Sequence, residues 1–120
     1  MIKKKLKNNT YHSLKSKGDF DSLYKRGKFI KNQNFGVRYY KTKGKQFFMG
    51  YAISKKNFSK AVDRNLIKRR MKSEVYNLLS HFDKCPPGKY LFYYLGNSLP
   101  SSLDINTGMS ESIKQIIQDT

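Results

Sequence analysis

The chain has 120 residues, and 25 Lys or Arg side chains against eight Asp or Glu give it a formal net charge of +17. Its length predicts one domain, residues 1–120, with a core large enough to fold without metals or disulfides. So large a surplus of positive charge predicts an anionic polymer as the partner. It also predicts a free protein of marginal stability that a bound polyanion stabilises.

Two other targets of positive charge are a membrane surface and an acidic protein. The longest apolar run, residues 90–95, is far too short to span a bilayer, and no hydrophobic segment follows the lysines after Met1. We therefore expect no membrane partner, no secretion signal and a cytoplasmic location. The single Cys85, in the loop sequence Cys-Pro-Pro-Gly, cannot form an internal disulfide and is expected to be structural.

Residues 1–15 are rich in Lys and poor in apolar side chains, so they predict a flexible basic arm that is loosely held until it binds its partner. His12 lies in this arm and is expected to be an extra contact rather than a catalyst. A short helix is predicted from Gly18 to about Arg26, because Phe20, Leu23 and Tyr24 have the spacing of one helical face. Packing in the core is expected for Leu23.

Three strands are predicted at residues 34–41, 45–54 and 89–95, with 28–30 as a candidate short fourth. The turn sequence at 42–44, Thr-Lys-Gly, predicts a hairpin between the first two strands. Alternation places two sets of side chains on opposite faces of the first strand, namely Phe35, Val37 and Tyr39 against Gly36, Arg38 and Tyr40. One face is expected to pack in the core and the other to be available for binding.

Residues 54–72 form the most basic stretch, with one acid, Asp63, and eight cations: Lys55, Lys56, Lys60, Arg64, Lys68, Arg69, Arg70 and Lys72. An amphipathic helix from Ala61 to about Phe82 is predicted by the apolar residues Ile67, Met71, Val75 and Leu78. Arg64 and Lys68 fall close to the axis of that apolar stripe. Either their charged heads reach past it to solvent, or the partner covers that end of the helix. Because the cations are clustered rather than interleaved with acids, they favour a polyanion-binding face over a merely solvated one.

After this helix, residues 83–88 predict a loop with two prolines, and residues 96–108, rich in Ser, Asn and Gly, predict a second loop. A short closing helix is predicted by the spacing of Ser110, Ile113, Ile116 and Ile117. The strand, helix and strand that span the basic stretch predict a βαβ crossover. Together these segments predict a small α+β domain, with about four strands in a mixed sheet packed by helices.

The basic stretch resembles the signature of the protein subunit of bacterial ribonuclease P, in which a strand ending in Ser-Lys-Lys is followed by a helix with Ala-Val-x-Arg-Asn-Arg-x-Lys-Arg. The matching residues are Ser54, Lys55, Lys56, Ala61, Val62, Arg64, Asn65, Lys68 and Arg69. Leu66 stands where the family usually has its second Arg, and Lys72 stands where it usually has Arg. A second family pattern, whose aromatic residues line a cleft for single-stranded RNA, matches Asp19, Phe20, Tyr24, Lys25 and Gly27.

The resemblance implies an RNA-binding subunit that assists a catalytic RNA in the endonucleolytic removal of the 5′ leader from precursor tRNA, with no obligate protein partner. The catalytic RNA would be bound by Lys55, Lys56, Lys60, Arg64, Asn65, Lys68, Arg69 and Lys72. The leader would be bound by Phe20, Tyr24, Arg38 and Tyr40. The resemblance also implies that the crossover is left-handed, as in some ribosomal-protein and elongation-factor domains, although such connections are normally right-handed.

A self-sufficient nuclease would need paired carboxylates for metal ions, or a His pair with a Lys, in one pocket. The eight acids are scattered along the chain, and metal-ligand spacings, a Walker loop and a nucleophile elbow are absent from the sequence. We therefore expect no catalytic residue, no metal site and no cofactor in the protein. The resemblance assigns hydrolysis to the RNA subunit, which requires magnesium. The alternative from another class is a structural ribosomal protein, which would have a similar charge and size.

Overall fold

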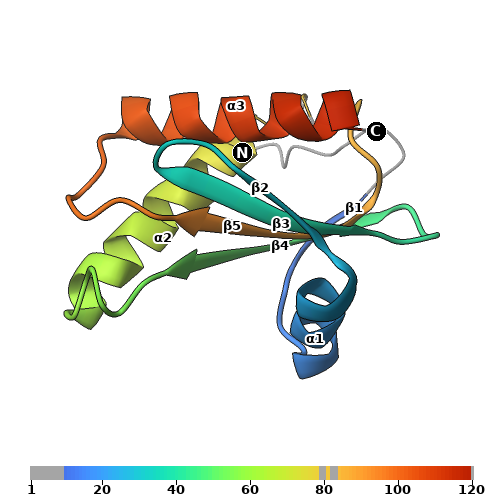
Figure 1. Ribbon diagram of the computed structural model, residues 1–120, viewed down its shortest axis with the longest axis horizontal. Helices are drawn as coiled ribbons and strands as arrows, with labels where there is room; N and C mark the ends of the chain where they lie inside the picture. The colour runs from blue at the N-terminus through green and yellow to red at the C-terminus, as the bar shows by residue number, and fades with distance from the viewer. Residues whose placement is uncertain (1–9, 79–80, 82–83, 120) are drawn as a thin grey trace.

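The computed structural model describes residues 10–78, 81 and 84–119 (Figure 1). The elements follow one another as β1 (Thr10–Ser13), α1 (Lys17–Arg26), β2 (Lys28–Lys31), β3 (Phe35–Lys41), β4 (Gln46–Ile53), α2 (Ala61–Asn77), β5 (Gly88–Tyr94) and α3 (Ser102–Asp119). The five strands form one mixed sheet in the order β1-β4-β5-β3-β2. In Figure 1, α2 and α3 lie on one side of the sheet and α1 lies on the other. The predicted α+β class is confirmed, with one strand more than the four expected.

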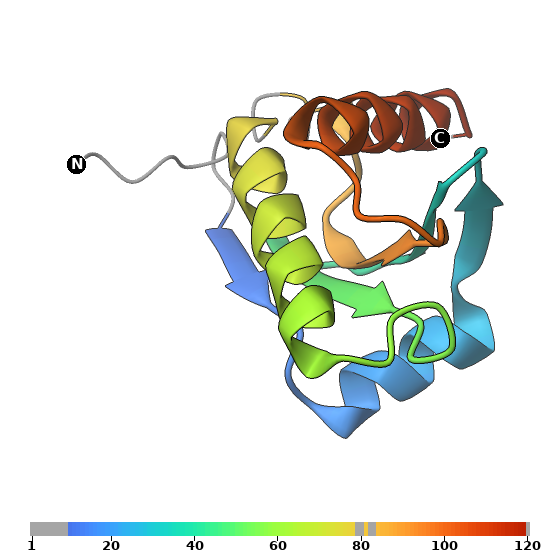
Figure 2. The ribbon, with the colours of Figure 1, turned by 90° about the vertical axis from the view of Figure 1, so that its left-hand side faces the viewer.

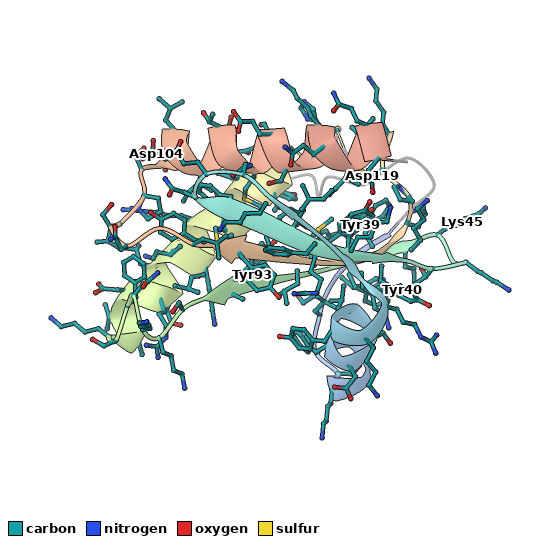
Figure 3. The ribbon with its side chains drawn as sticks, viewed as in Figure 1. Tyr39, Tyr40, Lys45, Tyr93, Asp104 and Asp119 are labelled. Atoms are coloured by element: carbon teal, nitrogen blue, oxygen red, sulfur yellow. The ribbon has the colours of Figure 1, made fainter. Side chains whose placement is uncertain are left out.

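The alternation predicted for β3 is also confirmed. Its residues Phe35, Val37 and Tyr39 are buried in the main core, together with Ile67, Met71 and Val75 of α2 and Ile105, Met109, Ile113 and Ile116 of α3. A smaller cluster, made of Leu14, Leu23 and Leu91, holds α1 against the opposite face. In Figure 3, Tyr39 lies on the α3 side of the sheet, whereas Tyr40 and Tyr93 lie on the α1 side. The two faces of one sheet are therefore free to serve different purposes.

The predicted hairpin between residues 34–41 and 45–54 is wrong. Strand β5 lies between β3 and β4, antiparallel to the first and parallel to the second, and β3 forms its hairpin with β2. The Thr42 N–H donates to the Pro87 carbonyl (3.1 Å), which joins the turn to the start of β5. Gly88 permits this close approach, because an added Cβ would lie 2.2 Å from the Tyr40 carbonyl oxygen. Strands β4 and β5, joined by α2, form the predicted crossover, whose left hand stays a prediction.

Part of the expected flexible arm is a strand. Residues of β1 pair in parallel with β4, where Tyr11 lies opposite Phe47 and His12 opposite Phe48. Leu14, 8% exposed, enters the smaller cluster, and its N–H donates to the Met49 carbonyl (2.8 Å). The Lys-rich composition of 1–15 concealed this alternation of inward side chains. The remaining residues of the arm, 1–9, lie outside the described residues.

The last helix is longer than the sequence predicted, because α3 begins inside the loop expected at 96–108. A reciprocal cap starts it: the Asp104 N–H donates to Ser101 Oγ (3.1 Å), and the Ser101 N–H donates to Asp104 Oδ2 (3.2 Å). Gly108 lets the helix approach the sheet, since an added Cβ would lie 2.1 Å from the Phe35 ring. Residues that are typical of loops thus cap the start of α3 and let the helix pack closely on the sheet. By contrast, α2 ends at Asn77, before the Phe82 expected.

Candidate RNA-binding surfaces

Most of the predicted RNA-subunit contacts form one exposed surface on the 54–60 loop and α2. We call this the basic surface, and its exposed members are Lys55, Lys56, Lys60, Asn65, Lys68, Arg69 and Lys72. The loop has a defined shape, because Ser54 Oγ accepts hydrogen bonds from the N–H groups of Lys56 (3.1 Å) and Asn57 (3.4 Å). Phe58, 7% exposed, anchors it in the main core. The side chains at its tip are therefore held on a fixed turn.

Arg64 and Arg70 do not join this exposed set. Arg64 is half-buried, and its Nη1 donates to the carbonyls of Phe58 (2.8 Å) and Ser59 (2.9 Å). Arg70 Nη1 donates to the Pro100 carbonyl (3.0 Å). The two alternatives for Arg64 and Lys68 are thus answered differently, because Lys68 is exposed whereas Arg64 folds back on the loop. Arg64 supports the shape of the loop, and its contact with RNA stays a prediction.

Where the structure describes the chain, no carboxylate forms an ion pair with a cation of the basic surface. The ion pairs among the described residues are Lys28 with Asp119 (3.1 Å) and Lys89 with Asp19 (3.0 Å), and neither belongs to this surface. Two acids lie close to it in sequence. Asp63 is in the first turn of α2, where a carboxylate favours the helix N-terminus, and Glu74 Oε2 accepts a hydrogen bond from Asn106 Nδ2 (3.0 Å). Leu66, which replaces a family Arg, is half-buried. Exposed Arg69 provides a positive charge three residues further along.

A second surface lies on the α1 side of the sheet. Figure 1 shows α1 beneath one end of that face. Beside it lie side chains that are exposed or half-buried, which we call the aromatic surface: Phe20, Tyr24, Phe29, Arg38, Tyr40, Phe48 and Tyr93. Tyr24 is 57% exposed and Phe29 is 43% exposed, unusually high values for rings beside a packed cluster. All four residues predicted to bind the leader belong to this surface.

Arg38 lies at the centre of the aromatic surface. Its guanidinium carbon is 5.6 Å from the centroid of the Tyr24 ring and 5.2 Å from that of Phe29. Its Nε also approaches the Tyr93 hydroxyl at 3.4 Å. Cations at such distances from ring faces are attracted by them. Burial, followed by the neighbouring Tyr93, raises the pKa of the Tyr24 hydroxyl, so the Tyr24 side chain remains neutral at physiological pH.

Helix α1 is held on the sheet by polar contacts as well as by Leu23. Lys89 Nζ pairs with Asp19 Oδ1 at 3.0 Å, with side chains that are 16% and 21% exposed. Burial alone would raise the pKa of Asp19, but hydrogen bonds from Lys89 and Ser16 outweigh it and lower the pKa below its ordinary value. At the other end of the helix, Arg26 Nη1 donates to the Tyr40 hydroxyl (3.5 Å). Phe20 is half-buried beside the Leu23 cluster, so it can pack and contact a ligand.

The sequence reasoning missed three members of the aromatic surface: Phe29, Phe48 and Tyr93. Phe29 lies edge-on to Tyr93, with ring centroids 5.5 Å apart, and its ring covers Gly36. Phe48 stacks on His12 at 5.4 Å. Alternation along a strand separates the side chains of its two faces. It cannot show that these three rings gather beside α1, because that depends on the strand order.

Within residues 10–78, 81 and 84–119, no three His, Cys, Asp or Glu side chains lie together as metal ligands would. Across the same residues, no helix is long and apolar enough to cross a membrane. The absence of a metal site and of a cofactor from this protein stays a prediction.

The comparisons with known proteins agree on one family. The family model described as Ribonuclease P matches residues 9–114. This chain belongs to the ribonuclease P protein family. The resemblance found in residues 54–72 is thereby confirmed, and nothing in the comparisons supports a structural ribosomal protein.

Relatives within the ribonuclease P family match over part of their length. The ribonuclease P protein component of Finegoldia magna is 38% identical over 71 residues, which cover 59% of this chain and 61% of that protein. That of a Nitratiruptor species is 38% identical over 80 residues, or 67% and 68% of the two chains. The matched segment thus spans less than two thirds of the Finegoldia protein.

Solved ribonuclease P structures match more completely. The Staphylococcus aureus RNase P protein has a TM-score of 0.74 and 26% identity, covering 86% of this chain and 93% of that one. The Thermotoga maritima protein, at 20% identity, shares the fold with a TM-score of 0.72 over 87% of this chain and 96% of that one. The α+β architecture is therefore that of ribonuclease P proteins.

Proposed function

We propose that this chain is the RNA-binding subunit of a ribonuclease P holoenzyme and assists removal of the 5′ leader from precursor tRNA. The observation that supports this most strongly is the presence of two different RNA-suited surfaces on one small domain of the family. The basic surface has exposed cations that form no ion pair in the described part of the chain, and the aromatic surface has exposed rings around Arg38. Such a protein can bind a folded RNA and an unpaired strand at once.

The basic surface is proposed to bind the catalytic RNA. Cations that pair with no carboxylate among the described residues can neutralise phosphates and release the counterions condensed on the RNA. Phosphate contacts fix position without reading sequence, which suits a protein that must dock on one folded RNA. The fixed turn at Ser54 and the Arg64 bonds to the loop would limit the ordering required when Lys55 and Lys56 bind.

The aromatic surface is proposed to bind the single-stranded leader of precursor tRNA. Unpaired bases stack on Phe and Tyr rings whatever their identity, so a leader of varied sequence could be held. Arg38, already in contact with Tyr24 and Phe29, would bring positive charge to the backbone of the same strand. Tyr40 and Phe20 extend the surface along β3 and α1.

We further propose that the RNA subunit carries out hydrolysis with magnesium ions that the RNA coordinates. This division of labour between RNA and protein is supported by the acidic residues of the chain. They are scattered along the sequence and do not form the carboxylate pairs that two-metal chemistry requires. The protein would position the precursor and screen repulsion between the phosphates of the two RNAs. Maturation of tRNA places such a protein in the cytoplasm.

The test is reconstitution with the ribonuclease P RNA of the same host. Cleavage of precursor tRNA is measured at near-physiological magnesium, with and without the protein. We expect the protein to accelerate cleavage, and the variant Lys68→Ala/Arg69→Ala to lose most of that effect. The matched control, Lys43→Ala/Lys45→Ala, removes two charges from the β3–β4 loop, at the opposite end of the sheet from the start of α2 (Figure 1), and should retain it. An unchanged rate with the unmodified protein would contradict the proposal.

A further inference from the structure

A pocket that neither proposed surface includes lies between α2 and the edge strand β1. It has a volume of about 300 Å³ and is lined by Tyr11, Arg69, Lys72, Ser73 and Tyr76. The four lining residues of α2 are spaced by three, one and three, so they form one stripe of the helix. Figure 2 shows α2 beside β1, which supplies Tyr11. The volume is at the lower end of the range for small-ligand sites, about 300–1,000 Å³.

The lining combines aromatic rings with positive charge. Tyr11 and Tyr76 are half-buried and pack against the main core, and the Tyr11 hydroxyl lies 2.8 Å from that of Tyr51, which fixes the ring. Arg69 and Lys72 are exposed on the helix beside them. None of the described residues that line the pocket is acidic. An apolar, ring-bearing floor flanked by two cations complements a planar base joined to a phosphate.

We propose that this pocket binds one unpaired nucleotide of an RNA strand, with the base against Tyr11 and Tyr76 and the phosphate at Arg69 and Lys72. The proposal rests on the proposed function, since it concerns RNA bound to the basic surface, to which both cations belong. Tyr11 packs on the α2 side of the sheet, whereas the aromatic surface lies on the α1 side. The nucleotide therefore comes from the RNA subunit rather than from the leader.

A pocket-filling variant separates base binding from charge. In Ser73→Phe a ring enters the pocket from α2 while Arg69 and Lys72 remain, so phosphate attraction is kept and the base is excluded. Thr107→Phe places the same ring at an exposed position of α3 and serves as the control. Affinity for the RNA subunit should fall about 5- to 150-fold in Ser73→Phe, the value of one stacked base. The salt dependence of binding should not change, and Thr107→Phe should bind as the unmodified protein does.

Residue-resolved NMR of the full-length protein, titrated with the unpaired oligonucleotides A4 and U4 and separately with inorganic phosphate, tests the site itself. We expect both oligonucleotides to shift the Tyr11 and Tyr76 ring signals and the Ser73 amide, and phosphate alone to shift none of the rings. In Ser73→Phe the shifts of the Tyr11 and Tyr76 rings should disappear, whereas those of Tyr93 and Phe48 persist. Shifts with phosphate alone would make the pocket an anion site and overturn the proposal.

Two further outcomes would also overturn it. Oligonucleotides that shift only the aromatic surface would show that bases do not enter the pocket. Nuclear Overhauser contacts from the Ile2 or Leu6 methyl groups to the Tyr11 and Tyr76 rings would assign the pocket to the chain's own first nine residues. Neither outcome touches the proposed function, which fails only if the protein does not bind the RNA subunit or accelerate precursor cleavage.

Discussion

The basic surface and the aromatic surface differ in what their charged groups already contact. Lys55, Lys68 and Lys72 are exposed and belong to no ion pair among the described residues. Arg38 of the aromatic surface, by contrast, touches two rings and a hydroxyl. Free cations act over a Debye length and are weakened by salt, whereas stacking acts only on contact. Under the proposed function, the protein docks on the RNA subunit by charge and holds the unpaired leader by its rings.

The largest effect that would test this comparison is the salt dependence of binding to the RNA subunit. Six exposed cations on the basic surface give an expected slope of log K against log salt of about −4 to −5. Between 50 and 200 mM salt, affinity should therefore fall about a thousandfold. Lys68→Ala/Arg69→Ala should make the slope shallower by about 1.5 to 2, and Lys43→Ala/Lys45→Ala should leave it unchanged. A slope shallower than about −2 for the unmodified protein would remove the electrostatic account.

Removal of the exposed rings should have the next largest effect, and it should weaken only the binding of the leader. In Phe20→Ala/Tyr24→Ala, binding to precursor tRNA should weaken by about 1–3 kcal/mol for each base that no longer stacks. Binding to mature tRNA should not change, because it has no leader. Since Phe20 is half-buried, thermal unfolding must first show a folded variant, and Tyr24→Ala alone serves as the milder form. If the folded variant still preferred precursor over mature tRNA as strongly as the unmodified protein, Phe20 and Tyr24 would be ordinary packing residues and not leader contacts.

The surplus positive charge predicts that the protein without bound anions is only marginally stable. We expect circular dichroism at low salt to show partial unfolding, and sulfate or phosphate to restore helix signal and raise the melting temperature, because bound anions stabilise the folded state by linkage. The protein at equal ionic strength in chloride is the control for screening alone. Identical spectra and melting temperatures in water and in sulfate would refute this expectation.

A variant of Arg64 tests whether this residue supports the 54–60 loop or belongs to the basic surface as a phosphate contact. Because its Nη1 bonds two carbonyls of the 54–60 loop, Arg64→Ala should destabilise the protein by about 1–2 kcal/mol and speed amide exchange in that loop. The RNA salt slope should stay within about 0.5 of the unmodified value if Arg64 only supports the loop. A slope shallower by about 1, with normal amide exchange, would instead make Arg64 a direct phosphate contact.

The smallest expected effect concerns the attachment of α1 beneath the aromatic surface. The pKa of Asp19 is lowered in the folded protein, so its contribution to stability is present above its ordinary pKa, near 4, and is lost as pH falls through the folded value. Asp19→Asn should cost about 1 kcal/mol in urea unfolding at pH 7 and almost nothing in acid solution below the folded pKa of Asp19. Asp21→Asn, at an exposed position of the same helix, is the control. Equal losses at both pH values would contradict the ion-pair explanation.

Much of this arrangement was predictable because it depends on local spacing. The alternation of Phe35, Val37 and Tyr39 fixed the core face of β3, and the steps between Ile67, Met71 and Val75 fixed the buried stripe of α2. Clustered cations without interleaved acids then identified the exposed face of the same helix. Each of these inferences needs only residues a few positions apart.

The failures arose where distant residues decide the structure. The hairpin prediction for 42–44 failed because β5, more than forty residues later, lies between the two strands. β1 was missed because its few inward side chains lie in a Lys-rich stretch and pair with β4, about 35 residues away. The direction of the Arg64 head depends on loop carbonyls and not on its angle around the helix. The aromatic surface likewise needed the strand order before Phe29 and Tyr93 could be placed together.

Site-specific crosslinking tests the separation of the two surfaces most directly. Cys85 is 6% exposed and burial raises the pKa of its thiol to about 12, so a new exposed cysteine can be labelled selectively at neutral pH. Benzophenone would be attached in Val62→Cys, beside the basic surface, and in Lys25→Cys, beside Tyr24. In the holoenzyme with precursor tRNA, the probe at 62 should crosslink to the RNA subunit, and the probe at 25 to the leader, with no product from mature tRNA. Crosslinks from both positions to the same RNA segment would contradict the account.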